Sequence, residues 1–73
     1  MKKEDFVKRM GLGIRNLREE KSLSLEQLAF NAGIEYSQLS RIENGKINTS
    51  IYSTYNIAKA LGISMSELFF IVQ

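Results

Sequence analysis

Apolar residues recur along this chain at spacings of three and four, which places them on one face of an α-helix. The first such stretch predicts a helix from about Glu4 to Lys21. Its apolar face comprises Phe6, Met10, Ile14 and Leu17. Gly11 and Gly13 interrupt this helix, and each glycine costs roughly 1 kcal/mol relative to alanine in a helix interior. We therefore expect its first turns to fray, or the helix to begin later.

A short second helix is predicted from about Leu25 to Ala32. Ser24 and Gln27 have the spacing of a capping box, in which each side chain accepts a hydrogen bond from the backbone amide of the other residue. Gly33 ends the helix, because glycine adopts the left-handed conformation of a helix end without a steric penalty. The predicted buried face comprises Leu28, Ala29 and Ala32.

The third predicted helix runs from about Tyr36 to Asn44 and is closed by Gly45. At about 100° per residue its two faces separate cleanly. Leu39 and Ile42 share the apolar face. The opposite, polar face comprises Tyr36, Ser37, Ser40, Arg41 and Asn44. This outer face can both donate and accept hydrogen bonds.

Two further helices complete the predicted fold. Ser50 caps a fourth helix, Ile51 to Leu61, and Ser64 opens a fifth from Met65 to about Val72, with Glu67 completing a second capping box. The expected inward face of the fourth helix comprises Ile51, Thr54, Tyr55, Ala58 and Leu61. The pattern contains no strand, linker or repeat. The sequence therefore predicts an all-α fold of five helices in a single domain spanning residues 1–73.

Composition narrows the possible chemistry. The 73 residues include no Cys and no His, which excludes disulfides, the usual zinc ligands and catalysis by either residue. Ser37 and Ser40 have no histidine base, and so small a core leaves no room for a substrate pocket. We therefore expect no enzymatic activity, no cofactor, no metal and no small-molecule substrate.

Charge and hydropathy say less about partners. The net charge is only +2, which is a weak hint of a nucleic-acid partner. The N-terminus is charged, and no apolar run approaches the roughly 20 residues of a membrane span. We expect a cytoplasmic protein without membrane contact.

An ordered set of motifs extends over about residues 11 to 69. The motifs are Ile14-Arg-Asn-Leu-Arg18, Ser24-Leu-Glu-Gln-Leu-Ala29, Gly33-Ile34, Leu39-Ser-Arg-Ile-Glu-Asn-Gly45, Ile57-Ala-Lys-Ala-Leu-Gly62 and Glu67-Leu68. Together they resemble the lambda-repressor-like (Xre/Cro) helix-turn-helix family of transcriptional regulators. The resemblance implies that helices two and three form the helix-turn-helix of a sequence-specific DNA-binding protein.

Two short helices joined at Gly33 can cross steeply, so that the first rests over the DNA backbone while the second enters the major groove. The expected base contacts are Glu35, Tyr36, Ser37, Ser40 and Arg41. The expected backbone contacts are Ser24, Gln27, Asn44, Lys46 and Tyr52. Helix capping is the alternative for Glu35, a locally formed turn for Asn44 and Lys46, and ordinary solvent exposure for the others.

Arg18 and Glu43 have a different expected role. In proteins of the family the matching residues form an internal ion pair, whereas a phosphate contact is the alternative for Arg18. The chain departs from the family at Leu25, where a phosphate-binding Gln is usual. Ser24, Gln27 or a free backbone amide at this helix start could supply that contact instead.

Four consecutive apolar residues near the C-terminus, Phe69-Phe70-Ile71-Val72, are more than one helix face can bury. We expect Phe69, Phe70 and Ile71 to pair two copies, so that a homodimer binds double-stranded DNA at an inverted-repeat operator as a repressor or autoregulatory controller. The structural alternative is that Leu68, Phe69 and Val72 close the monomer core. The functional alternative is a protein-interaction module, such as an antitoxin or anti-regulator subunit.

Overall fold

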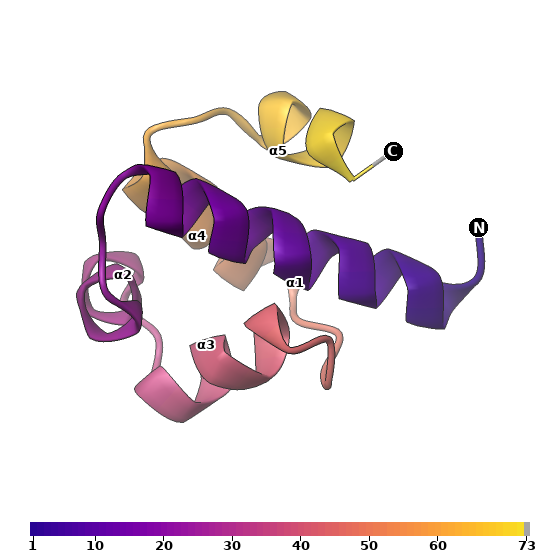
Figure 1. Ribbon diagram of the computed structural model, residues 1–73, viewed down its shortest axis with the longest axis horizontal. Coiled ribbons are helices and arrows are strands. Elements are labelled where there is room, and N and C mark those ends of the chain that lie inside the picture. Colours follow the sequence, from indigo (N-terminus) through magenta and orange to yellow (C-terminus); the bar gives the residue numbers. More distant parts are fainter. Residues whose placement is uncertain (73) are drawn as a thin grey trace.

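The computed structural model describes residues 1–72 and contains five α-helices and no strand within that range (Figure 1). This confirms the predicted all-α fold. The helices are α1 (Lys3–Glu20), α2 (Leu25–Ala32), α3 (Tyr36–Glu43), α4 (Ile51–Leu61) and α5 (Met65–Ile71). Their ends lie within one residue of the predicted ends.

Local signals in the sequence determine several helix ends. At the start of α2 the amide of Gln27 donates to Ser24 Oγ at 3.0 Å, and the amide of Ser24 donates to Gln27 Oε1 at 2.8 Å. A second capping box joins Ser64 and Glu67 at the start of α5. Gly33 ends α2 with a φ of 69°, a left-handed conformation that favours glycine. The tight turn of the predicted helix-turn-helix therefore forms here.

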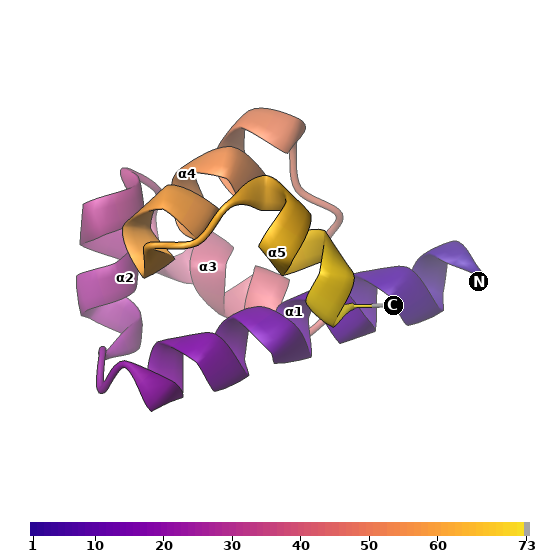
Figure 2. The ribbon, with the colours of Figure 1, turned by 90° about the horizontal axis from the view of Figure 1, so that it is seen from above.

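The helices surround one apolar core. Its fully buried large side chains come from every helix and are Ile14, Leu28, Leu39, Ile57, Leu61 and Leu68. α1 packs against α3 on one side and α5 on the other, and α2 packs against α3 and α4 (Figures 1 and 2). Consequently α3 and α5 lie on opposite sides of the molecule. No helix of residues 1–72 is long and apolar enough to cross a bilayer.

The expected interruption of α1 at its two glycines is wrong, because the helix runs unbroken from Lys3 to Glu20 and both glycines are buried. A Cβ at Gly11 would clash with the carbonyl oxygen of Ile42. A Cβ at Gly13 would lie 3.3 Å from the Ile71 side chain. The glycines therefore allow α1 to approach its neighbours closely, and this packing stabilises the helix against their low propensity.

The expected inward face of α4 is wrong at two positions. Ile51 is 80% exposed and Tyr55 is 47% exposed, whereas Ile57 is fully buried. The buried face that packs toward the core comprises Thr54, Ile57, Ala58 and Leu61. Thr54 is accommodated there because its hydroxyl donates to the carbonyl oxygen of Ser50 at 2.8 Å. α4 is therefore rotated so that Ile51 and Tyr55 face outward.

Candidate nucleic-acid interface

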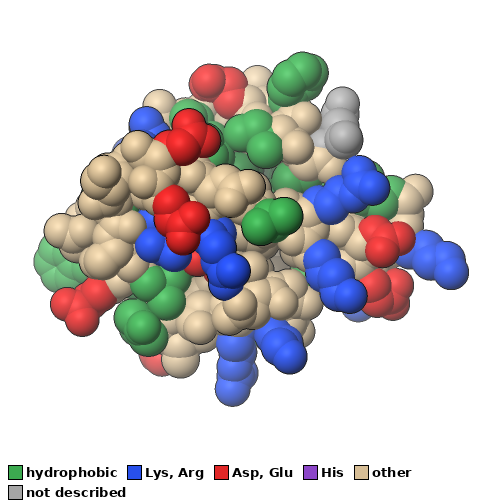
Figure 3. Space-filling view, in the orientation of Figure 1, with side chains coloured by type: hydrophobic (Ala, Val, Ile, Leu, Met, Phe, Trp, Pro, Cys, Tyr) green, Lys and Arg blue, Asp and Glu red, His purple; other side chains and the backbone are tan. Residues whose placement is uncertain are grey.

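The polar face of α3 forms an outer surface of the molecule. Leu39 and Ile42 are buried beneath it. Four of the five candidate base-contact residues are exposed, namely Glu35, Tyr36, Ser37 and Arg41. The fifth, Ser40, is half-buried. Glu35 occupies the N-cap position but makes no side-chain capping bond, so its carboxylate is free to accept from another partner. In Figure 3, Lys and Arg side chains project from the lower edge of the molecule, below α3.

Glu43, on the opposite side of α3, ties this helix to α1. Its side chain is only 2% exposed. Arg18 Nε donates to Glu43 Oε2 at 2.8 Å, and Arg18 Nη2 donates to Glu43 Oε1 at 3.0 Å. The hydrogen bond with Glu43 raises the pKa of Arg18 above its ordinary value, against the opposing effect of burial. A third hydrogen bond runs from Arg18 Nη1 to the carbonyl oxygen of Leu23 at 2.9 Å, so all three nitrogens of this guanidinium have a partner within the protein.

Arg15 also contacts Glu43, a contact that the sequence analysis did not predict. Its Nε lies 3.5 Å from Glu43 Oε1, and its Nη2 donates to Asn44 Oδ1 at 2.6 Å. Asn44 Nδ2 in turn donates to the carbonyl oxygen of Ser40 at 2.9 Å. Two arginines of α1 therefore hold the C-terminal end of α3, and one of them also orients a candidate backbone-contact residue.

The turn after α3 is packed against α1 as well. Gly45 has a φ of 69°, and a Cβ there would lie 2.8 Å from Cγ of Lys8. Asn44 and Lys46, on either side of this glycine, are both exposed. The polar groups of this turn are thus presented next to the outer face of α3 on a turn that α1 supports.

The remaining candidate backbone contacts lie at two helix starts. Ser24 and Gln27 hydrogen-bond to each other at the start of α2, and Tyr52 is exposed in the first turn of α4. Leu25 is half-buried and packs against the core, so it does not replace the usual glutamine. The capping box occupies the amides of Ser24 and Gln27, so the first-turn amides of α2 that remain available to an anion are those of Leu25 and Glu26.

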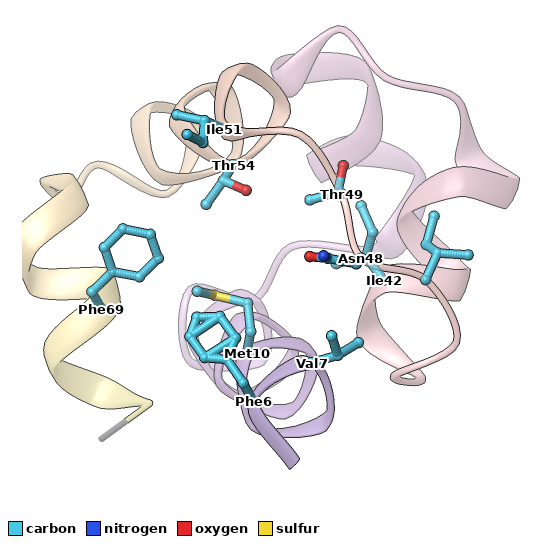
Figure 4. A pocket seen from close by; sticks show the side chains of 10 residues that line it. Phe6, Val7, Met10, Ile42, Asn48, Thr49, Ile51, Thr54 and Phe69 are labelled. Atoms are coloured by element: carbon cyan, nitrogen blue, oxygen red, sulfur yellow. The ribbon is translucent and has the colours of Figure 1, made fainter. Parts of the chain in front are cut away.

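An apolar cavity of about 140 Å³ lies between α1, the segment 47–49, α4 and α5. In Figure 4, Phe6 and Met10 form one wall, and Phe69 and Ile51 lie across from them. Its polar lining residues are Asn48, Thr49 and Thr54, none of which is charged. Residues 1–72 also contain no group of three His, Cys, Asp or Glu side chains that could hold a metal ion. The residues that line the cavity therefore include no carboxylate, imidazole or thiol group.

The sequence pattern of the helix-turn-helix family matches residues 14–68, which include all of α2, α3 and α4. The chain belongs to this family, whose members are lambda-repressor-like (Xre) regulators. Control protein C.MunI of a Mycoplasma species is 41% identical over 66 residues, which cover 89% of each chain. The uncharacterized HTH-type transcriptional regulator y4dJ of Sinorhizobium fredii is 36% identical over 64 residues, covering 88% of this chain and 83% of its own.

One solved structure has a sequence identity to this helix-turn-helix protein similar to that of C.MunI. The restriction-modification controller protein C.AhdI from Aeromonas hydrophila superimposes with a TM-score of 0.84 at 40% identity, covering 89% of this chain and 97% of its own. Membership makes the chain one of a family of DNA-binding transcriptional regulators, which is not a family of enzymes. These relatives do not favour the alternative of an antitoxin or anti-regulator subunit.

Proposed function

We propose that this helix-turn-helix protein is a sequence-specific transcriptional regulator that reads the DNA major groove with α3. The observation that carries the proposal is the exposed polar face of α3 on a helix whose C-terminal end is held by two arginines of α1. A rigidly held helix can present its side chains to base edges at fixed positions. Arg41 suits guanine O6 and N7, and Ser37 can bond to several bases.

We further propose that the chain binds as a homodimer at an operator with two inverted half-sites. α3 has eight residues and is therefore about 12 Å long, which covers only about four base pairs. Such a short site recurs too often in a genome to specify one operator. The exposed side chains of Phe69, Phe70 and Ile71 offer an apolar surface for pairing, on the side opposite α3.

The role we propose is that of a repressor or autoregulatory controller. C.MunI and C.AhdI, about 40% identical to this chain, are named as control or controller proteins. C.AhdI is further described as a restriction-modification controller, and we propose a comparable regulatory role for this chain. The contacts with phosphates would come from Ser24, Gln27, Asn44, Lys46 and Tyr52, with a backbone amide of α2 in the place of the usual glutamine.

Selection of bound fragments from a pool of random duplex DNA tests this proposal. The purified chain should enrich one motif made of two inverted half-sites whose centres lie about 34 Å apart, one turn of DNA. A mobility-shift titration with the selected fragment at two salt concentrations should show weaker binding at the higher salt. Enrichment of no motif, or equal affinity for the selected and scrambled fragments, would show that the chain is not a sequence-specific regulator.

A further inference from the structure

Arg15, Arg18 and Glu43 form a cluster in which the charges do not balance. Two guanidinium groups face one carboxylate. Arg18 makes the two shorter bonds to Glu43, and its side chain is only 13% exposed. Arg15 makes one long contact of 3.5 Å, and its side chain is 37% exposed. The excess positive charge therefore lies on Arg15, at the surface.

Arg15 is also held in a fixed position by its second partner. Its Nη2 donates to Asn44 Oδ1 at 2.6 Å, and Asn44 donates to the carbonyl oxygen of Ser40. Within residues 1–72 the Nη1 atom of Arg15 makes no hydrogen bond. Because guanidinium is planar, two fixed nitrogens also fix the direction of the third. Arg15 thus presents a free donor beside the end of α3.

We propose that Arg15 binds a phosphodiester of the DNA backbone, together with Asn44, while the other side of its guanidinium holds Asn44 in place. This inference rests on the proposed function, because the phosphate belongs to the DNA that α3 reads. Arg15 extends from α1 to Asn44 at the C-terminal end of α3, in the turn that also carries the exposed Lys46. A guanidinium and an amide side by side supply N–H donors at the spacing that phosphate oxygens accept.

Arg15→Gln tests the inference by removing the charge while leaving a polar side chain of similar reach. Affinity should fall about tenfold on the selected operator and by a similar factor on random duplex DNA, since a phosphate carries no sequence information. The slope of log affinity against log salt should decrease in magnitude by about 1. Arg15→Lys, which keeps the charge but not the planar fork, should restore the salt slope and only part of the affinity.

Arg9→Gln is the matched control, because Arg9 is an exposed arginine of the same helix without an ion pair in the described part of the chain. It should leave both the affinity and the salt slope close to those of the unaltered chain. Thermal denaturation of Arg15→Gln checks that the fold persists, since Arg18 still neutralises Glu43 in that variant.

A second measurement needs no substitution. In the unaltered chain, the Nε–H resonance of Arg15 should shift on addition of a short operator duplex, whereas that of Arg18, already bonded to Glu43, should stay in place. If the unaltered chain binds its operator but Arg15→Gln retains the full affinity and salt slope, the inference is wrong and the proposed function stands. If the unaltered chain binds no DNA, both fail together.

Discussion

At the scale of single residues, surroundings decide what two arginines of equal charge can do. Arg18 is largely buried and directs its guanidinium nitrogens at Glu43 and at the carbonyl oxygen of Leu23. Arg41 is exposed on the outer face of α3 and has no ion pair within residues 1–72. Of these two side chains, only Arg41 is free to form hydrogen bonds with a base edge.

Arg41→Ala should therefore weaken binding to the selected operator by about 1–3 kcal/mol and have a much smaller effect on random DNA. The reason is that a bidentate contact with guanine is lost only where the guanine is present. Titration of the variant with the operator and with a scrambled duplex of equal length measures the difference. Equal losses on the two duplexes would reassign Arg41 to the phosphate backbone.

Arg18→Met should lower the free energy of unfolding by about 3 kcal/mol, because it leaves the buried carboxylate of Glu43 with only the long contact to Arg15. Chemical denaturation measures this loss, and Arg9→Met, which removes an exposed charge from the same helix, should be nearly neutral. Unchanged stability combined with lost operator binding would instead make Arg18 a phosphate contact.

At the scale of helices, the sequence predicts where each helix begins and ends better than which way it faces. Ser24 and Ser64 act within their own helix turns, so their effect is local. The orientation of α4 is different, because Ile51 and Tyr55 lie four residues apart and fit an apolar face of their own. Packing against α2 favours the alternative face with Ile57 at its centre, and no local pattern reveals that choice.

Some parts of the candidate site could likewise be predicted from the sequence, whereas others depend on how the helices pack. The outer face of α3 follows from about 100° per residue, so its polar residues could be identified from the sequence alone. The ion pair between Arg18 and Glu43 is present, and it was predicted from the resemblance to the family. The bonds of Arg15 join residues 28 and 29 positions apart and depend on the register between α1 and α3. Arg15 belongs to the motif Ile14-Arg-Asn-Leu-Arg18, but the motif does not reveal which residues Arg15 contacts.

The close approach of α1 and α3 makes two neighbouring glycines behave differently. Gly11→Ala should destabilise the fold by about 1–3 kcal/mol despite the better helix propensity of alanine, because the new methyl group meets backbone atoms of Ile42 and Glu43. Gly13→Ala meets only side-chain atoms of Ile71 and Val72, so it should be neutral or slightly stabilising. Thermal denaturation of the two variants measures the contrast, and equal effects would contradict the packing explanation.

At the scale of the whole molecule, size favours two copies on one operator. The longest extent of the molecule is 30 Å, close to the roughly 34 Å between equivalent points on successive turns of DNA. Two copies that touch near one end could therefore place their α3 helices in successive major grooves. A contact through α5 leaves the outer face of α3 open (Figure 1), and the two copies must meet side by side, not back to back, for both α3 helices to face the same duplex.

The α5 surface can be tested against another exposed aromatic residue of the same chain. Phe70 on α5 is 74% exposed, and Phe30 on α2 is 84% exposed. If pairing occurs through α5, Phe70→Glu should turn a dimer into a folded monomer, because a charge cannot be desolvated in an apolar contact without a large cost. Phe30→Glu should leave the dimer intact, and this result would distinguish a specific interface from non-specific hydrophobic association.

Sedimentation at micromolar concentration gives the mass of each species, and the monomer mass is 8.3 kDa. The unaltered chain and Phe30→Glu should sediment at twice that mass, and Phe70→Glu at the monomer mass with its helix content preserved. Phe70→Glu should also lose most of its preference for the two-half-site operator over a single half-site, because linking two binding events raises the overall affinity without new base contacts. An unaltered chain that sediments as a monomer and binds one half-site as tightly as two would show that α5 does not pair the copies.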